Sequence, residues 1–251
     1  PEQALTKPAS ELAHLTSTSP AAIVRFSRKI GFDSFPAMKV GLAKYFNNNQ
    51  FFERDMIINS DDSYENCANK LLAQITDVCT TTANHIDNAV LGQVVHMIDH
   101  ADCVYLMGVG SSANVAQDMQ QKLLRINKKA FFLPDSQINL LSTITIRKED
   151  VVLVFSFSGT TNVIAASAQA AKKQGAFLVA ITGNPDSPIG QTADVCLSTP
   201  AIERKTRIGA VSSRYSQQYI CDLLFLCLIS KNYEEAEKLT MHASGLLSHI
   251  L

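Results

Sequence analysis

Hydroxyl side chains gather beside glycines at two places in the sequence. The first is SFSGTT at residues 156–161, in which Gly159 lets a ligand approach the backbone closely. The second is GVGSS at residues 108–112. Hydroxyl and backbone N–H groups bind a phosphate dianion without a fixed counter-charge, so the ligand can exchange. We therefore expect both stretches to contact one phosphorylated ligand; the alternative is that the small residues only form tight turns.

Each hydroxyl-rich stretch follows an apolar run that predicts a buried strand. Val151–Phe155 precedes the first stretch and Cys103–Met107 precedes the second. A helix is predicted after each, from Asn162 to Gln174 in the first case. The N–H groups and positive dipole end at the start of a helix attract anions, so both corners are expected to point at the same phosphate.

Strands and helices alternate regularly beyond Asp99, which predicts a parallel sheet with helices on both faces. In such sheets ligands bind beyond the carboxyl ends of the strands. The predicted strands are Cys103–Met107, Ala130–Leu133, Val151–Phe155, Phe177–Ile181 and Val195–Leu197. Two predicted helices at the end of the chain, Tyr215–Ser230 and Tyr233–Ile250, are apolar enough to indicate subunit packing, with the core of a monomer as the alternative.

The first 50 residues carry a different pattern, in which two short helices flank a polar turn at residues 16–19. Ser19 is the expected N-cap of the second helix and Pro20 its first residue. Short helices joined in this way are typical of the helix-turn-helix, whose second helix enters the DNA major groove. The alternative is a solvated basic face on a small helical bundle. The residues expected to pack inward from the second helix are Ile23, Phe26 and Ile30.

The opposite face of this second helix combines small, hydroxyl and basic side chains. Small residues permit close approach to DNA, hydroxyls bind phosphates, and Arg25 is placed to reach a base edge. The candidate DNA-binding residues are Thr18, Ser19, Ala22, Arg25, Arg28 and Lys29.

An acidic helical stretch connects the two patterns. Two helices are predicted between Ser63 and Ile98. This stretch could carry a signal between modules, form a dimer contact or cover the sheet. The apolar stripe expected on its first helix is Cys67, Leu71, Ile75 and Val78.

Charge and composition bound the class of protein. The chain has 251 residues and a net charge of −1, but residues 1–46 carry six Lys or Arg against three Asp or Glu, while residues 47–100 carry two against eight. Only the first segment therefore favours a polyanion. Six cysteines without C-x-x-C spacing are typical of reduced core residues. No signal peptide or membrane-length apolar run is present, so we expect a cytoplasmic protein.

Taken together, these motifs resemble a known family. GVGSS, SFSGTTNVI and the stretch AITGNPDSPIGQTADVCL resemble a sugar isomerase (SIS) domain, and AAIVRFSRKIGFDSFPAMKVGLA resembles the N-terminal helix-turn-helix of RpiR-type bacterial transcription regulators. The resemblance covers nearly the whole chain. It implies an α/β SIS domain with a parallel five-stranded sheet flanked by helices in a flavodoxin-like three-layer arrangement, preceded by a small all-α helix-turn-helix domain.

The resemblance also implies domain boundaries. We expect a helix-turn-helix domain at residues 1–50, a linker and connecting helix at 51–84, and the phosphosugar-binding SIS domain at 85–251. Such domains usually open with one more helix than the sequence shows before Ser10, so the first helix is expected to be missing.

Carried over onto matching positions, the SIS pattern implies the ligand contacts. Asp135 and Gln137 could equally cap the helix that follows them, and Arg214 could be a surface charge. The candidate phosphosugar-binding residues are Ser111, Ser112, Gln137, Ser156, Phe157, Ser158, Gly159, Thr161 and Arg214.

The function implied is a phosphosugar-responsive DNA-binding regulator, expected to be a repressor of a sugar or amino-sugar catabolic operon. Its expected partners are operator DNA, an effector such as N-acetylmannosamine 6-phosphate or another amino-sugar 6-phosphate, and a second or further copy of the chain, with no membrane, metal, cofactor or catalytic residue. One alternative is a SIS-fold sugar-phosphate isomerase, which needs a carboxylate or histidine to move a proton. Another is a nucleotide-dependent oxidoreductase, because Gly108–Ala113 fits G-x-G-x-x-A.

Overall fold

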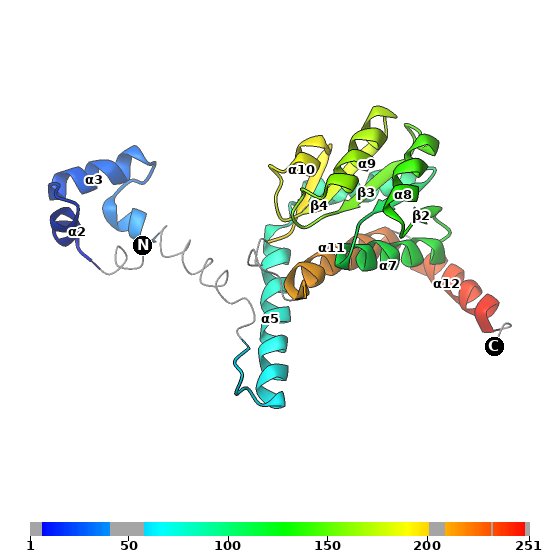
Figure 1. Ribbon diagram of the computed structural model, residues 1–251, viewed down its shortest axis with the longest axis horizontal. Helices are drawn as coiled ribbons and strands as arrows, with labels where there is room; N and C mark the ends of the chain where they lie inside the picture. The colour runs from blue at the N-terminus through cyan, green and yellow to red at the C-terminus, as the bar shows by residue number, and fades with distance from the viewer. Residues whose placement is uncertain (1–6, 41–57, 201–208, 232, 249–251) are drawn as a thin grey trace. The chain divides into compact units, whose positions relative to one another are not determined.

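The computed structural model describes residues 7–40, 58–200, 209–231 and 233–248 (Figure 1). The chain divides into two compact units, Pro1–Asp55 and Met56–Leu251, and each is described by itself. The expectation that a first helix is missing stays a prediction, and residues 51–57 of the predicted linker lie outside the described residues. The predicted domain boundaries at residues 50 and 84 stay predictions.

The first unit contains the two predicted short helices, α2 (Ala9–Leu15) and α3 (Pro20–Lys29). The Ser19 hydroxyl accepts a hydrogen bond from the Ala22 N–H at 3.2 Å, and Pro20 begins α3, which confirms the predicted start. The helix ends where Gly31 adopts a left-handed conformation with φ of +93°. Residues 35–40 form a further helical segment.

Packing in the first unit differs from the prediction. Ile23 is half-buried, but Phe26 and Ile30 have exposed fractions of 54% and 46%, so the prediction that both pack inward is wrong. A unit of this size buries only the narrow strip of each helix that faces its neighbours. The buried residues are Ala13, Ser27, Phe35 and Met38.

The second unit is built on the predicted five-stranded parallel sheet, with strand order β2-β1-β3-β4-β5. Its strands lie within one residue of their predicted limits, because each is a short apolar run between polar turns. They are β1 (Val104–Met107), β2 (Ala130–Phe132), β3 (Val151–Phe155), β4 (Phe177–Thr182) and β5 (Val195–Ser198).

Helices cover both faces of this sheet, giving the three-layer arrangement (Figure 1). Apolar side chains of α6, α7 and α11 share one core with β1, β3 and β4, whereas those of α9 and α10 pack on the other face. The helices of this unit are α5 (Tyr64–His85), α6 (Asn88–His100), α7 (Ser111–Arg125), α8 (Ser136–Ser142), α9 (Asn162–Lys173), α10 (Pro188–Thr192), α11 (Val211–Ser230) and α12 (Tyr233–Ser248), with a 3₁₀ turn η1 (Thr143–Thr145).

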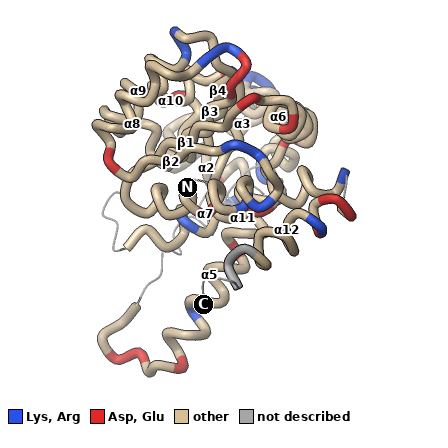
Figure 2. Tube along the Cα trace, turned by 90° about the vertical axis from the view of Figure 1, so that its right-hand side faces the viewer, with Lys and Arg blue, Asp and Glu red and all other residues tan. Residues whose placement is uncertain are grey.

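The long helix α5 packs along α11. Acidic residues precede and begin this helix (Figure 2), and Asp62 accepts hydrogen bonds from Lys70 Nζ at 2.5 and 2.7 Å. The predicted stripe on α5 is corrected in part, because Cys67, Leu71 and Ile75 are only half-buried. The buried stripe is Gln74, Val78 and Thr82, so α5 presents a largely polar line to its neighbour.

None of the helices in the described ranges combines the length and the apolar character needed to span a bilayer. All six cysteines are free thiols, but only Cys103 and Cys221 are buried, so the expectation of core residues holds in part. The half-buried cysteines are Cys67, Cys79, Cys196 and Cys227.

Candidate functional site

The carboxyl ends of β1 and β3 define the centre of the candidate ligand site. These strands are neighbours, with Met107 paired to Val154. The chain passes from β1 outward to β2 and later returns to the opposite side of β1 as β3, so the strand order reverses between them. In open parallel sheets this switch point is where ligands bind. Both hydroxyl-rich stretches, 108–112 and 156–161, leave the sheet here.

The helices that follow these two strands begin without a side-chain cap. The N-cap of α7 is Gly110 and that of α9 is Thr161, and neither side chain accepts a bond from its helix. By contrast, α5, α6, α8 and α10 each begin with a serine or aspartate whose oxygen accepts N–H bonds. Uncapped first-turn N–H groups remain available to an anion. The helix α11, which follows Ala210, also begins without a side-chain cap. What distinguishes α7 and α9 is that their uncapped starts follow the two strands that flank the switch point.

Close packing fixes the shape of the loop after β3. Gly159 has φ of +66°, and a Cβ there would lie 1.8 Å from Ser187 Oγ. The Gly159 N–H donates to Ser156 O at 3.1 Å, and its carbonyl accepts from Ile189 N at 3.2 Å. These bonds make Gly159 a structural part of the loop, and its N–H is already engaged. Its predicted backbone contact with the ligand stays a prediction.

Phe157 ties the same loop to the end of β4. Its carbonyl accepts hydrogen bonds from Gly183 N at 2.9 Å and Thr182 Oγ1 at 3.2 Å. A Cβ on Gly183 would lie 2.9 Å from the Phe157 ring, so the ring packs directly against that backbone. The loop is thereby preorganised for binding through its neighbours in β4.

Three predicted ligand hydroxyls have no hydrogen-bond partner in the described part of the chain. They belong to Ser156, Thr161 and Ser111, and Ser156 is only 4% exposed. A hydroxyl without a partner in the protein can donate its proton to a ligand oxygen. Ser156 and Thr161 lie on one loop and Ser111 on the adjacent one, so the arrangement is suited to an oxyanion with several acceptor atoms.

Two further predicted hydroxyls are already bonded within the protein. Ser158 Oγ accepts from Thr160 N at 3.4 Å and from Thr160 Oγ1 at 3.1 Å, which leaves its own proton available. Ser112 is buried and donates to Gln217 Oε1 at 2.9 Å. The Ser112 hydroxyl can therefore contact a ligand only as an acceptor, or by giving up this bond.

Gln137 and Arg214 lie on exposed positions of other helices. Asp135 Oδ1 accepts from the N–H groups of Gln137 at 2.8 Å and Ile138 at 3.0 Å, so the alternative role of Asp135 as a helix cap is confirmed. The Arg214 guanidinium lies over the Tyr215 ring at 5.2 Å. Their predicted ligand contacts stay predictions.

Two buried amides at this sheet edge escaped the sequence reasoning. Gln217 is 1% exposed and bridges Ser112 to Ile181 O, to which its Nε2 donates at 3.5 Å. Asn139 donates weakly to Leu106 O, and its Oδ1 has no partner. The only sequence signal for Gln217 is helical spacing of polar residues in SSRYSQQ, which periodicity arguments normally assign to solvent.

The candidate DNA-binding face on α3 is exposed and cationic. Arg25, Arg28 and Lys29 stand at helical spacings of three and four, so they share one face. All three are exposed, and none has an acidic partner among the described residues. Ser19 is exposed but its hydroxyl caps α3, and Thr18 Oγ1 lies 3.0 Å from Thr16 Oγ1. Ala22 is half-buried on the same side of the helix.

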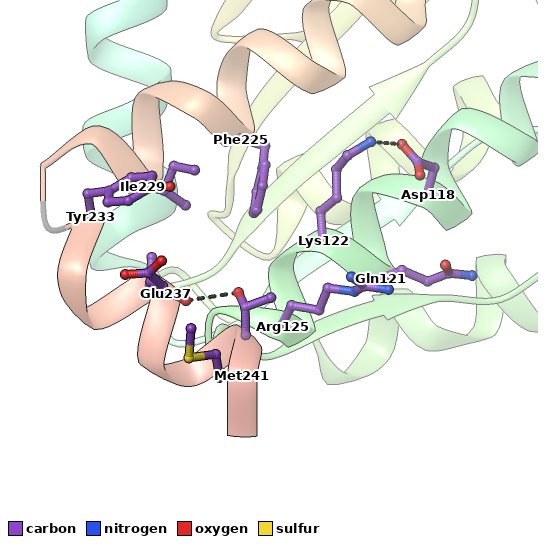
Figure 3. Close-up of a pocket in the computed structure, with 11 residues that line it drawn as sticks. Asp118, Gln121, Lys122, Arg125, Phe225, Ile229, Tyr233, Glu237 and Met241 are labelled. Carbon is purple, nitrogen blue, oxygen red and sulfur yellow. Dashed lines mark hydrogen bonds and ion pairs between the residues drawn. The ribbon is translucent and has the colours of Figure 1, made fainter. Parts of the chain in front are cut away.

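A pocket of about 590 Å³ lies away from the switch point, between α7, α11 and α12 (Figure 3). Lys122 and Phe225 project into it, and none of the predicted ligand residues lines it. The lining residues are Asp118, Gln121, Lys122, Arg125, Phe225, Ile229, Tyr233, Ala236, Glu237, Thr240 and Met241.

A charge cluster forms the inner wall of this pocket. Lys122 pairs with Asp118 and, at 2.6 Å, with Asp222. Burial acts to raise the pKa of Asp118, but hydrogen bonds from Lys122 and Gln218 outweigh it and hold that pKa below its ordinary value. Burial likewise opposes protonation of Lys122, yet its two carboxylate partners raise its pKa. The ion pair of Lys122 with Asp222 therefore connects α7 to α11.

Comparison with known proteins places both units in one family. Residues 1–49 match the helix-turn-helix domain of the rpiR family, and residues 97–227 match the SIS domain. The chain belongs to the RpiR-type regulators that carry a SIS domain.

Solved structures show the same fold in regulators and in sugar-phosphate enzymes. The Vibrio vulnificus NanR protein, complexed with ManNAc-6P, is 23% identical with a TM-score of 0.70 over 100% of this chain and 89% of that one. The sugar isomerase domain of an RpiR transcription factor from Sphaerobacter thermophilus is 18% identical, with a TM-score of 0.64 over 70% and 97% of the two chains. A Methanococcus jannaschii protein, with an inferred 3-hexulose-6-phosphate isomerase function, is 18% identical with a TM-score of 0.57 over 66% and 95%.

Proposed function

We propose that this RpiR-type protein is a transcription regulator whose affinity for DNA responds to a sugar phosphate bound at the β1/β3 switch point. The observation that carries the proposal is the pair of uncapped helix N-termini at the switch point, with the Ser111 hydroxyl in the first turn of α7 and the Ser156 hydroxyl in the loop before α9. A helix-turn-helix unit with unpaired cations on its second helix precedes this site in the same chain. Phosphate sensing and DNA binding are therefore combined in one polypeptide.

The proposed effector is an amino-sugar 6-phosphate, with N-acetylmannosamine 6-phosphate as the first candidate. Support comes from the NanR protein complexed with ManNAc-6P, whose fold extends over this entire chain. We further propose that the protein represses an amino-sugar catabolic operon and acts as a homodimer or higher oligomer. Paired recognition helices on a palindromic operator require at least two copies of α3.

Sensing is favoured over isomerisation by the composition of the two loops. Aldose–ketose isomerisation needs a carboxylate or imidazole that moves a proton between adjacent carbons. Residues 108–112 and 156–161 contain hydroxyl, glycine and apolar side chains only. Such a set binds and orients an anion, and an isomerase would not need the preceding helix-turn-helix.

The deciding experiment is a thermal-shift screen of the full chain against sugar 6-phosphates and their unphosphorylated parents, with NAD and NADP included. A ligand at a hundredfold excess over Kd is expected to stabilise the folded state by about 2.7 kcal/mol. The proposal requires that stabilisation depends on the phosphate group of the ligand. It also requires that the ligand is recovered chemically unchanged after incubation with the protein. Conversion to another sugar would make the protein an enzyme, and a response to NAD or NADP alone would overturn the phosphosugar site.

A further inference from the structure

A buried polar seam runs from α7 through the first two turns of α11 to α5. The buried side chains in the first two turns of α11 are polar, whereas those from Ile220 to Leu228 are apolar. Burial of a polar group costs free energy unless the group is hydrogen-bonded. The hydrogen bonds of the seam therefore favour one packing arrangement of the three helices. Its members are Ser112 on α7, Ser212, Ser216 and Gln217 on α11, and Gln74 and Thr82 on α5.

Gln217 connects the seam to the candidate ligand site. Its Oε1 accepts from Ser112 Oγ at 2.9 Å, and Ser112 lies in the first turn of α7, whose N-terminus is open to the phosphate. Its Nε2 donates to Ile181 O near the end of β4. A ligand that engages the Ser112 hydroxyl or N–H therefore acts directly on a side chain of α11.

Two hydroxyl contacts connect α11 to α5. Gln74 Nε2 donates to Ser212 Oγ at 2.6 Å, and Ser216 Oγ lies 3.0 Å from Thr82 Oγ1. The single Thr82 proton goes to Val78 O at 2.7 Å, so Ser216 is the donor of the second contact. Ser212 and Ser216 are one helical turn apart and neighbour Gln217, so a rotation or shift of α11 affects both contacts together.

The seam is incompletely satisfied in this conformation. Gln74 Oε1 is buried and has no hydrogen-bond partner among the residues that the structure describes. An unpaired buried acceptor destabilises the arrangement that contains it. A second packing arrangement of α11 against α5 that supplies a donor would avoid this cost, and a ligand that binds the two arrangements with different affinity would shift the equilibrium between them.

We propose that this seam couples ligand occupancy at the α7 loop to the position of α5, the helix that follows the DNA-binding unit in sequence. Gln217 is the positioning residue that links the loop to the seam. Coupling between distant sites passes through packed side chains and hydrogen bonds with two discrete arrangements. This inference rests on the proposed function, because it assigns the route by which that function would be regulated.

The test compares a seam variant with a matched control in the full chain. Thr82→Val combined with Ser216→Ala removes both partners of one contact, which leaves no orphaned donor and preserves side-chain volume. Thr80→Val combined with Ser230→Ala makes the same changes on the same helices. Both control hydroxyls are exposed and bond only to carbonyls of their own helix.

Two readouts are expected to separate these variants. Hydrogen exchange of the α5 amides should become about fivefold faster in the seam variant, the change expected from losing one net hydrogen bond, and stay unchanged in the control. The second readout is the factor by which N-acetylmannosamine 6-phosphate changes affinity for a DNA duplex selected by the wild-type chain from a random library. In the seam variant this factor should be close to one, within about twofold, although the variant still binds the ligand with wild-type affinity. In the control variant the factor should stay at the wild-type value.

A third variant examines the link at the ligand loop. Gln217→Met removes both amide contacts but keeps the length of the side chain. Without ligand, this variant should accelerate hydrogen exchange in α7 and also in α5, although the described hydrogen bonds of the Gln217 side chain go to α7 and β4 and not to α5.

Unchanged α5 exchange in both Gln217→Met and the Thr82→Val/Ser216→Ala variant would overturn the seam proposal. An unchanged coupling factor in the latter variant would do the same. If the wild-type chain fails to respond to N-acetylmannosamine 6-phosphate, the proposed effector is wrong. The hydrogen-exchange measurements need no ligand, so they still test whether the seam connects α7 to α5.

Discussion

Individual hydroxyl groups carry the recognition chemistry assigned to this protein. Ser156 is nearly inaccessible but unbonded, whereas Ser158 is exposed and accepts two bonds from Thr160. These two serines therefore offer a phosphate two donors at different depths of one loop. Neutral donors bind a dianion less tightly than lysine or arginine would, which suits a sensor that must release its effector.

Replacement of Ser156 and Ser158 together by alanine should weaken phosphosugar binding about 100-fold or more, since each bond to a charged oxygen is worth about 1.5–3 kcal/mol. Isothermal titration with the phosphosugar found in the thermal-shift screen measures the change. Ser230→Ala, an exposed serine at the end of α11, is the control. Binding equal to wild type in the double variant would remove the phosphate-loop assignment.

The two glycines of the candidate site, Gly159 and Gly110, differ in the space that surrounds them. Both have φ near +60°, but a Cβ on Gly159 meets Ser187, whereas a Cβ on Gly110 meets nothing within 4 Å. Gly110 combines φ of +59° with ψ of −130°, a backbone region nearly restricted to glycine, so Gly110→Ala should cost about 1–3 kcal/mol from backbone strain alone. Gly159→Ala should cost at least about 1 kcal/mol more, because it displaces the Ser187 cap of α10.

Urea unfolding of both variants at neutral pH measures this difference. Equal stability losses would mean that the contact with Ser187 does not restrict the loop. A larger loss in Gly110→Ala would contradict the assigned geometry outright.

At the scale of elements, helix ends and helix faces decide what each unit can bind. The starts of α7 and α9 face the switch point without caps, while α3 presents an exposed row of cations. An α-helix start offers N–H groups to one phosphate, and a cationic helix face suits a row of phosphates in a groove. Under the proposed function, the two units would recognise different anions by different parts of a helix.

Arg25→Ala should weaken binding to the selected DNA duplex and relax its sequence preference, with a loss of about 1–3 kcal/mol if Arg25 contacts a base edge. Electrophoretic mobility shift at fixed salt measures the affinity. Lys148→Ala removes an exposed cation from the sheet-containing unit and should have no such effect. Retained affinity and preference in Arg25→Ala would argue against α3 as the recognition helix.

The charge cluster between α7 and α11 predicts a pH dependence of stability. Because the folded-state pKa of Asp118 is lowered, its contribution is present above the ordinary aspartate pKa of about 3.9 and is lost as pH falls through the folded value. Asp118→Asn should therefore destabilise the protein at pH 7, and the difference from wild type should shrink below about pH 4.

Urea unfolding between pH 3 and pH 7 follows this difference. The exposed Asp102, whose side chain has no ion pair in the described part of the chain, supplies the control variant Asp102→Asn. A difference for Asp118→Asn that stays constant with pH would mean that ionisation does not carry the contribution.

For the whole molecule, regulation requires that ligand binding and DNA binding influence each other. If an effector changes DNA affinity by some factor, DNA must change effector affinity by the same factor. Typical factors lie between about 5 and 150. The covalent order of the chain, with the helix-turn-helix before α5 and the sheet after it, makes α5 the element through which such coupling would enter the SIS domain.

We expect the two factors, measured separately by titrating DNA at saturating effector and effector at saturating DNA, to agree and to differ clearly from one. An unphosphorylated parent sugar should give a factor of one. A factor of one with the phosphosugar as well would show that the two units bind independently, which would contradict a regulatory role.

Local pattern was sufficient to determine most of the architecture. Apolar runs such as Val151–Phe155 form buried strands because both faces of a parallel sheet are covered, and the start of α3 follows from the chemistry of Ser19 and Pro20. The resemblance of the loop motifs to a SIS domain identified the family from the sequence alone. The hydroxyl-rich stretches 108–112 and 156–161 were placed at the sheet edge correctly because parallel strands all end on one side.

The tertiary structure alone decided which polar residues are interior. Gln217, Gln74 and Thr82 are hydrophilic by type, so periodicity places them in solvent, yet each is buried because a partner on another helix supplies its hydrogen bond. Conversely, Phe26 was expected inside and is exposed, since the small first unit buries only a narrow strip of α3. The periodicity of a helix shows only how its polar and apolar residues are distributed around its axis. Burial depends on which residues from other parts of the chain pack against the helix.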